Sequence, residues 1–484
     1  MLYLLFFLGV LNLCIRFKPI ASAASLPIKP LPTTVKVTVD TQTRYQTVDG
    51  FGVSEAFQRA TYVQGKHGLS PVNQQRAMDL LFSNDNGAGL SILRNGIGSS
   101  PTYDLDWMKS IAPVSPGSPN ATAKYEWDGD DAGQVWLTKG AIERGANLVY
   151  ANAWSAPGYM KTNGNDSNGG YLCGVRATNC SSGDWRQAYA DYLVQLLRFY
   201  QEKEGIAITH LGFVNEPDLN QTYASMFSDG FQAADFLGIL RPTLAKAGLG
   251  LVQIVCCEAT GWSDGADLLA ELQSVPGAED MLDIYSVHGY STNPTLPLNT
   301  SHKVWQTEWA DLDGKWNPAW DNLGKDGEGI SWANKIQQAF TLSNVSGFLY
   351  WIGAEQGDSN SALVHLQNDT VAASGRLWAF AQFSRFVKPG AIRLDTKSSI
   401  GYVGASAFVN VNGGNAIQVI NNGHVDVLAE VEVQGVDDKG YAGSWITNNE
   451  NDLTRDDVPT IHGVFNGLTF NVTIPKRSMM SFLL

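Results

Sequence analysis

The stretch His210-Leu211-Gly212-Phe213-Val214-Asn215-Glu216-Pro217 decides the fold that this sequence predicts. A short apolar run ends abruptly in two polar residues and a proline, and a short run of this kind is typical of a buried strand in a parallel sheet. The proline ends the strand, because it has no backbone N–H to donate to a neighbouring strand. The stretch therefore predicts a buried strand with polar side chains at its carboxyl end.

Runs of the same kind recur along the chain, and helical stretches such as Trp185–Glu204 and Phe231–Lys246 lie between most of them. In order, the eight runs are Val48–Ser54, Gly89–Arg94, Asn147–Trp154, His210–Asn215, Val252–Glu258, Ile284–Tyr290, Lys303–Trp309 and Gly347–Trp351. Eight βα units predict an α/β protein with a closed (β/α)8 barrel, the TIM barrel. The alternative is an open doubly wound sheet, but Gly87-Ala88-Gly89 lacks the third glycine of a dinucleotide fingerprint and precedes its strand.

Beyond about Phe386 the helical pattern stops, and short alternating strands are joined by Asn/Gly turns such as Asn412-Gly413-Gly414. This pattern predicts a small all-β domain, which the alternating stretch Val35–Val39 is placed to join. The predicted organisation is a signal peptide at 1–24, a catalytic barrel at 46–384, and a side β-sandwich domain made of 33–45 together with 385–484.

The N-terminal residues indicate secretion. An apolar run extends from Met1 to about Ile15 and is followed by the small-residue cleavage signal Ala21-Ser22-Ala23. The run is shorter than a membrane span needs. We expect a signal peptide cleaved near Ala24 and an extracellular protein without a membrane anchor, with an uncleaved anchor as the alternative.

Cysteines and glycosylation sequons fit an extracellular protein. Cys173 and Cys180 are spaced to close a small disulfide. Cys256 and Cys257 are adjacent on a buried-looking strand, and we expect them to be packed free thiols, with a strained vicinal bridge as the alternative. Eight Asn-x-Ser/Thr sequons support a glycoprotein made by a eukaryotic secretory route: Asn120, Asn165, Asn179, Asn220, Asn299, Asn344, Asn368 and Asn471.

Charge and motif searches exclude several classes of function. The net charge of -14 argues against a nucleic-acid partner, which would need a basic face. The sequence has no Gly-x-Ser-x-Gly elbow, no His-Glu-x-x-His motif and no Gly-x-x-x-x-Gly-Lys loop, and its seven histidines show no zinc spacing. We therefore expect no metal. We also expect a monomer whose only partner is its substrate.

Two glutamates end strands that face each other. Glu216 ends the fourth run and Glu308 the seventh, so both lie at the carboxyl-terminal rim where (β/α)8 barrels hold their active sites. Glycosidic bond cleavage needs such a pair, because one acid protonates the leaving oxygen while one carboxylate attacks or stabilises the sugar carbon. The alternative for a single strand-end glutamate is a surface salt bridge. Asn215 beside Glu216 makes the site more specific, since its amide can bond the sugar 2-hydroxyl.

Other run ends converge on the same rim. Arg94 can donate to a carboxylate and keep it ionised, or it can be part of a structural ion pair. Tyr290 can hydrogen-bond the nucleophile, whereas His288 is either part of this site or a histidine satisfied within the barrel. Trp154 and Trp351 can each stack on a sugar ring, or each can pack in the core.

Taken together, these residues resemble glycoside hydrolase family 30. The resemblance covers most of the chain and rests on Asp49-Gly50-Phe51-Gly52, Arg94, the Trp-Ser-x-Pro-x-x-Met-Lys-x-Asn-Gly stretch 154–164, Asn215-Glu216-Pro217, Thr307-Glu308-Trp309 and the side β domain. It implies that Glu216 is the acid/base, that Glu308 is the nucleophile, and that the reaction is a double displacement with retention and without a cofactor.

Within that family, the stretch 52–59 is similar to the fungal xylanase branch, in which an arginine of the first βα loop recognises the 4-O-methylglucuronic acid branch of glucuronoxylan. Arg59 is the matching residue here; the alternative is a solvated helix arginine. Bacterial glucuronoxylanases recognise the same branch from the loop after strand eight. Here that loop, 353–361, has no arginine, so the prediction depends on Arg59.

The resemblance thus predicts a secreted β-1,4-xylanase guided by the glucuronic acid branch, which could also release xylobiose. The second prediction is an endo-β-1,6-glucanase or another β-glycosidase of the same family. A third, different class is a carbohydrate-binding barrel without catalysis, against which the presence of both carboxylates argues.

Overall fold

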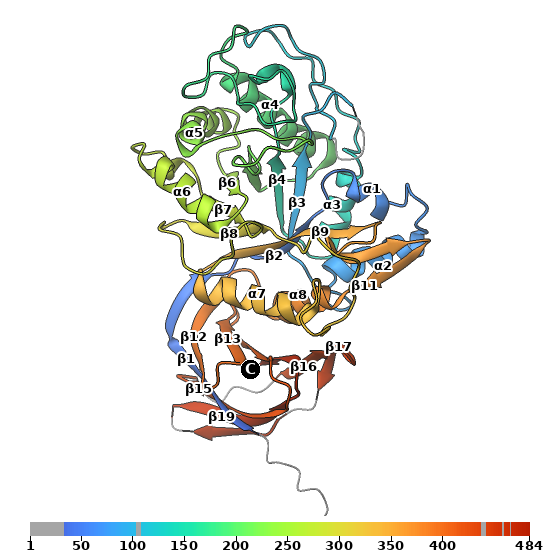
Figure 1. Cartoon of the computed structure of the whole chain (residues 1–484), viewed down its shortest axis with the longest axis vertical. Coiled ribbons are helices and arrows are strands. Elements are labelled where there is room, and N and C mark those ends of the chain that lie inside the picture. The colour runs from blue at the N-terminus through green and yellow to red at the C-terminus, as the bar shows by residue number, and fades with distance from the viewer. Residues whose placement is uncertain (1–32, 103–107, 437–441, 457–458, 465) are drawn as a thin grey trace, which may run out of the picture.

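The computed structural model describes residues 33–102, 108–436, 442–456, 459–464 and 466–484, so the predicted signal peptide lies outside the described residues. Two ten-stranded sheets dominate the described chain, with most of the helices packed around the first of them (Figure 1). Among the described residues, no helix is both long and apolar enough to cross a membrane.

The first sheet closes into the predicted barrel. Its eight parallel strands lie in sequence order, and β9 pairs with both β2 and β8 to complete the circle. They are β2 (Gly50–Ser54), β3 (Ile92–Ile97), β4 (Leu148–Ala153), β5 (His210–Gly212), β6 (Gln253–Ala259), β7 (Ile284–His288), β8 (Lys303–Glu308) and β9 (Gly347–Glu355). The α/β class and the TIM barrel are therefore confirmed.

Helices connect most of these strands, as predicted, whereas a loop connects β7 to β8. The helices are α1 (Arg59–Val63), α2 (Pro71–Phe82), α3 (Gln134–Glu143), α4 (Arg186–Arg198), α5 (Gly230–Lys246), α6 (Trp262–Gln273), α7 (Gly329–Leu342) and α8 (Gly375–Ser384). Short turns add η1 (Gly158–Met160), η2 (Phe199–Lys203), which continues α4, and η3 (Glu279–Met281). α5 begins with a capping box between Asp229 and Gln232, which satisfies N–H groups of its first turn.

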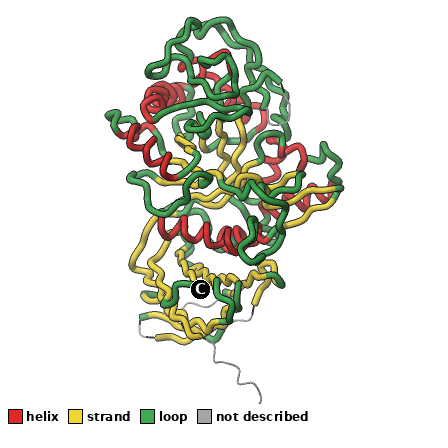
Figure 2. The backbone as a smooth tube through the Cα atoms, viewed as in Figure 1, coloured by secondary structure: helices red, strands yellow, loops and turns green. Residues whose placement is uncertain are grey.

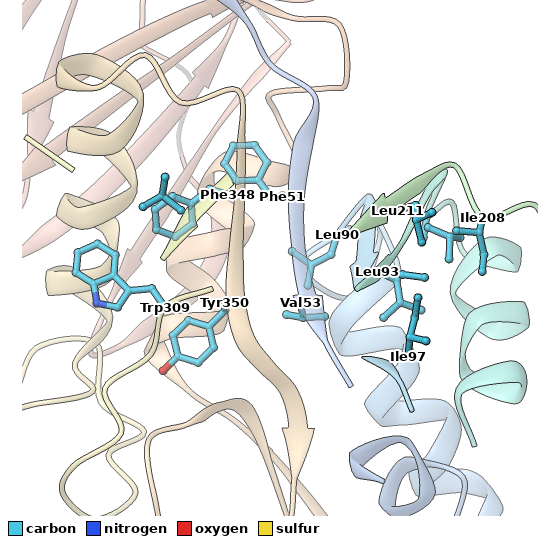
Figure 3. Packing of buried hydrophobic residues seen from close by; sticks show 14 of the residues in the cluster. Phe51, Val53, Leu90, Leu93, Ile97, Ile208, Leu211, Trp309, Phe348 and Tyr350 are labelled. Atoms are coloured by element: carbon cyan, nitrogen blue, oxygen red, sulfur yellow. The ribbon is translucent and has the colours of Figure 1, made fainter. Parts of the chain in front are cut away.

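Alternation along each strand divides the barrel core into two parts. Side chains such as Val53 and Leu93 point outward and pack with the surrounding helices, as Figure 3 shows. The opposite set fills the interior in a separate cluster, formed by Ile92, Tyr150, Val255, Ile284, Trp305 and Leu349. Arg94 lies two residues after Ile92 on β3, so its side chain points inward as that of Ile92 does. It therefore points into the barrel, nearer to the mouth.

The second sheet curls on itself to form the β domain (Figure 2). Its strands run in the order β17 (Asn451–Asp456), β16 (Gly443–Asn448), β20 (Ser478–Leu483), β14 (Asn415–Asn421), β13 (Val403–Val409), β12 (Ile392–Ser398), β1 (Thr33–Thr47), β15 (Val427–Gln434), β19 (Gly467–Ile474) and β18 (Ile461–Val464). The early strand β1 thus lies between β12 and β15, with Val35, Val37 and Val39 buried in this sheet's own core.

Helices α7 and α8 lie between the barrel and the β domain (Figure 1). The buried side chain of Gln382 on α8 donates to the hydroxyl oxygen of Thr447 (2.8 Å) and accepts from the Ser481 hydroxyl (2.5 Å). A buried polar group that loses its hydrogen-bond partner destabilises the fold. These bonds therefore hold the β domain against α8.

The bounds of the barrel strands differ from the predicted runs, and three of the differences affect the rim of the barrel. β3 continues past Arg94 to Ile97, and β9 continues past Trp351 to Glu355 because the added strand β10 (Ala362–Gln367) pairs with it, followed by β11 (Thr370–Ala373). β5 ends early at Gly212, so Asn215 and Glu216 lie in the loop beyond its last strand residue.

One cysteine prediction is confirmed and one is wrong. Cys173 and Cys180 form a disulfide across a Cα–Cα distance of 5.6 Å. Cys256 and Cys257 are also joined in a disulfide, instead of being free thiols, and the peptide bond between them is cis. Neighbouring side chains of a regular strand point to opposite faces. Here the cis peptide bond brings the two Cα atoms to 3.0 Å.

Candidate active site

A cavity of about 320 Å³ opens at the carboxyl ends of the barrel strands. Six residues singled out from the sequence line it. Arg94 and Asn215 are buried outside the lining, and Arg94 donates both to Asn215 and to the lining residue Glu308. The complete lining is Phe57, Arg59, Trp154, Glu216, Leu219, Gln221, Tyr223, Thr260, Tyr290, Glu308, Leu312 and Trp351. The predicted residues therefore lie together at the carboxyl ends of the barrel strands, where active sites of (β/α)8 barrels form.

Glu216 is held in an uncommon backbone conformation. Its φ of 44° lies in the left-handed region, and its N–H donates to the carbonyl oxygen of Glu258 on β6 (2.9 Å). For a residue with a Cβ this conformation costs about 1–2 kcal/mol, so the surrounding contacts must impose it. The carboxylate has two neighbours: Oε1 lies 3.2 Å from Nδ1 of His288, and Oε2 accepts from the Tyr223 hydroxyl (3.2 Å).

Glu308 ends β8 and receives a donor at each oxygen. Arg94 Nη1 donates to Oε2 (2.5 Å), and the Tyr290 hydroxyl donates to Oε1 (3.0 Å). Burial raises the pKa of Glu308, while the positive charges of His288 and Arg94 oppose that rise. Burial also raises the pKa of Tyr290 well above its usual value, so the phenol stays a donor. One oxygen of Glu308 lies within 4.8 Å of one oxygen of Glu216.

Arg94 is the central cation of the site and is fully buried. Besides Glu308, its Nη2 donates to the Glu258 carboxylate (2.9 Å) and to Oδ1 of Asn215 (2.6 Å). Its guanidinium also lies 4.4 Å from the ring centroid of Trp154, a cation–π contact. Arg94 thus contacts three strand-end residues at once, and it orients the Asn215 amide through the carbonyl oxygen.

Glu258 is a site residue that the sequence analysis missed. It ends the fifth run, is fully buried, and like Glu216 has a left-handed backbone, with φ 61°. Burial acts to raise its pKa, but Arg94 and His288 outweigh burial and lower the pKa to about 2. The signal was available, because the strand-end rule that selected Glu216 and Glu308 applies equally to run five.

His288 belongs to this site. Its ring lies between two carboxylates, with Nδ1 3.2 Å from Glu216 Oε1 and Nε2 2.6 Å from Glu258 Oε2. Burial alone would lower its pKa, but Glu308, Glu216 and Glu258 together raise it to about 10. The imidazole is therefore a cation at neutral pH, and both ring nitrogens donate.

Aromatic rings form the cavity wall around these charges. Trp154 and Trp351 lie with their ring centroids 5.8 Å apart, and Phe57 packs edge-on against Trp154 at 5.1 Å. Trp154 is only 2% exposed, so it packs in the core and lines the cavity at once. The sequence analysis had treated these two roles as alternatives.

Arg59 also lines the cavity, but it has a partner that the sequence did not reveal. It begins α1 directly after Phe57 and Gln58, both of which have a left-handed backbone. Its Nη1 donates to the Phe57 carbonyl (3.0 Å), and its Nε lies 3.5 Å from Glu355 Oε2 at the end of β9. The last residue of the eighth barrel strand therefore contributes a carboxylate that faces this arginine.

Glu216, His288 and Glu308 also have the spacing of a possible cation site, since one ligand atom from each lies within 4.8 Å of the others. These groups are, however, already paired with one another and with Arg94. The imidazolium and the guanidinium supply the positive charge that the carboxylates need, so the donor set does not call for a metal ion.

Comparisons with known proteins agree with this architecture. Residues 34–279 match the model of O-glycosyl hydrolase family 30. The structure is similar to the catalytic domain of GH30 xylanase C from Talaromyces cellulolyticus, with 41% identity, a TM-score of 0.85, and coverage of 93% of this chain and 99% of that one.

Two sequence relatives differ from each other in substrate. Endo-1,6-beta-D-glucanase BGN16.3 of Trichoderma harzianum is 26% identical over 87% of this chain and 86% of its own length. Glucuronoxylanase XynC of Bacillus subtilis is 23% identical over 72% of this chain and 76% of its own.

The lowered pKa of Glu258 predicts an acid dependence of stability. Its folded-state pKa of about 2 lies below the ordinary 4.5, so ionised Glu258 stabilises the fold above pH 4.5, and this stabilisation is lost as the pH falls toward 2. The shift corresponds to about 3 kcal/mol. The free energy of unfolding in urea is measured at about pH 5 and at about pH 2. Between these values it should fall by about 3 kcal/mol less in Glu258→Gln than in wild type, because the variant has no carboxylate to protonate at this position.

The matched control is Glu450→Gln, at an exposed position of the β domain, which should keep the wild-type acid dependence. An unchanged acid dependence in Glu258→Gln would contradict the assignment of a buried anion to this position.

Proposed function

This chain belongs to glycoside hydrolase family 30, and we propose that it is a retaining β-glycosidase with Glu216 as general acid/base and Glu308 as nucleophile. The observation that carries the proposal is the approach of the two carboxylates, whose oxygens come within 4.8 Å. Retaining glycosidases hold their carboxyl groups about 5–5.5 Å apart, whereas inverting enzymes leave about 6.5–9.5 Å for a water molecule.

In the first step the ionised carboxylate of Glu308 attacks the anomeric carbon while Glu216 gives its proton to the departing glycosidic oxygen. A glycosyl–Glu308 ester forms and the glycosidic C–O bond breaks. Arg94 and Tyr290 donate to the two oxygens of Glu308, which favours its ionised form before the attack.

In the second step Glu216, now a carboxylate, takes a proton from a water molecule that attacks the same carbon. The ester bond breaks, Glu308 leaves as the carboxylate, and two inversions give a product with the original β configuration. Asn215, whose carbonyl oxygen is held by Arg94, would present its amide nitrogen to the sugar 2-hydroxyl. Trp154 and Trp351 would stack on sugar rings.

For the substrate we propose β-1,4-xylan carrying glucuronic acid branches. Two observations support it: the 41% identity to a GH30 xylanase over nearly the whole chain, and Arg59 in the cavity wall. A guanidinium binds a carboxylate through two parallel hydrogen bonds. The branch carboxylate would compete with Glu355 for Arg59, so recognition means exchanging one anionic partner for another.

An extracellular site of action is part of the same proposal. The chain holds two disulfides, which persist in oxidising compartments, and its proposed polymer substrate lies outside the cell.

Nucleophile replacement tests the mechanism. Glu308→Gly should lose nearly all activity, because no covalent intermediate can form; added azide should restore cleavage of an activated aryl glycoside and yield the inverted α-glycosyl azide. Proton NMR identifies the product. With the wild-type enzyme, an α-anomer as the first product would refute retention.

Substitution of Arg59 tests branch recognition. We expect Arg59→Ala to lose about 10-fold or more in kcat/KM on glucuronoxylan, because a charge-assisted contact is worth about 1.5–3 kcal/mol, and to lose little on unsubstituted xylo-oligosaccharides. Mass spectrometry of the products locates the branch relative to each new reducing end. Equal losses on both substrates would sink the branch-recognition proposal.

Endo-β-1,6-glucanase activity is the second candidate, and the similarity to the Trichoderma harzianum glucanase favours it. Reducing-sugar assays on pustulan and on xylan separate the two. We expect kcat/KM on xylan to exceed that on the β-1,6-glucan; the reverse order would assign the chain to the glucanases while leaving the catalytic pair unchanged.

A further inference from the structure

Glu258 does not line the cavity, yet it receives more donors than either carboxylate assigned to the reaction. Its Oε2 accepts from Arg94 Nη2 (2.9 Å), from His288 Nε2 (2.6 Å) and from the Thr307 hydroxyl (3.0 Å). Its Oε1 accepts from the Tyr150 hydroxyl (2.6 Å). An ionised carboxylate is an acceptor only, so four donors identify this group as a permanent anion.

The anion determines where protons lie on His288. Nε2 faces Glu258 and must carry a hydrogen, which leaves Nδ1 facing Oε1 of Glu216 at 3.2 Å. A neutral ring would offer a lone pair at Nδ1 and draw the Glu216 proton onto Oε1. A cationic ring donates from Nδ1 instead, and the Glu216 proton must then lie on Oε2.

These two oxygens are not equivalent for catalysis. Oε1 faces His288, which is fully buried, whereas Oε2 contacts Tyr223, a residue of the cavity lining. Only a proton on Oε2 is on the side where a leaving group can take it.

We propose that Glu258 is a positioning residue that, by pairing with His288, keeps the acid proton of Glu216 on the cavity-facing oxygen. The inference rests on the proposed roles of Glu216 and Glu308 and deepens them. A backbone contact supports the same pairing, because the Glu258 carbonyl accepts from the Glu216 N–H and so ties the two left-handed glutamates together.

The charged groups around His288 favour its protonated form. Three carboxylates face the ring: Glu216, Glu258, and Glu308 at 3.8 Å from Nε2; Tyr290 packs edge-on at 5.9 Å. Besides the His288 ring, Arg94 is the cation that contacts Glu258 among the described residues, and Arg94 is shared with Glu308. With Arg94 and His288 positive, and with Glu258 and Glu308 negative, the cluster is neutral when Glu216 carries its proton. The pKa of about 10 at His288 agrees with this assignment.

The test is Glu258→Gln, which keeps the shape but removes the charge. We expect kcat/KM on the polysaccharide that wild type cleaves to fall about 100-fold, the usual share of general acid catalysis. On a dinitrophenyl glycoside of the same sugar, whose leaving group needs no proton, the loss should stay below about 10-fold. A loss that is equal on both substrates, or no loss, would overturn the proposal.

A pH profile supplies a second readout. Without the anion the pKa of His288 falls, so the alkaline limb of kcat/KM should move to lower pH by about one unit or more. Glu328→Gln is the matched control: Glu328 is also a buried, hydrogen-bonded carboxylate but lies outside the cavity lining, so both activities and the profile should stay as in wild type.

Should Glu258→Gln fail to fold, the wild-type enzyme still decides the matter. With ¹⁵N-labelled histidine and a His288→Gln spectrum to assign the signal, NMR should show both nitrogens of His288 protonated up to about pH 8; a ring that titrates near about pH 6.5 would overturn the proposal. Azide rescue at a residue other than Glu308 would instead refute the proposed function, so the two failures are distinguishable.

Discussion

The ion pair between Arg94 and the two carboxylates of Glu258 and Glu308 is the constraint on which the active site depends. A buried ion costs several kcal/mol to desolvate, and removing one partner leaves the other charge uncompensated. The barrel meets this cost by bringing strand ends together: β3 supplies the cation, β6 and β8 supply the anions, and Asn215 beyond β5 supplies a neutral acceptor. Closure of the barrel therefore also brings the charged groups of the site into contact.

Much of this arrangement was predictable from sequence. Eight apolar runs identified the barrel, and the rule that catalytic groups end strands identified Glu216, Glu308, Arg94 and Tyr290. Glu258 satisfies the same strand-end rule but was not selected. Its contacts with Arg94 and His288, which are distant in the chain, cannot be seen in the local sequence. The disulfide between adjacent cysteines escaped for a different reason, since residue spacing does not report a cis peptide bond.

The substrate was harder to predict from the sequence than the reaction. The proposed reaction rests on buried groups with several fixed partners. The proposed specificity rests on the half-buried Arg59, which begins α1 directly after two left-handed residues. Its partner Glu355 lies nearly three hundred positions away, on the strand that closes the barrel. No local pattern links the two, although the proposed branch carboxylate would have to displace Glu355 from Arg59.

The position of β1 has a consequence for biosynthesis. This strand is among the first parts of the described chain to be made, yet Thr33 pairs with Val427 and Val37 with Ser398, near the opposite end. A ribosome therefore releases the barrel sequence while β1 still has two open edges, which are templates for aggregation. Non-local pairing of this kind is slow to form, so β1 must wait for the last strands before the side sheet can be completed.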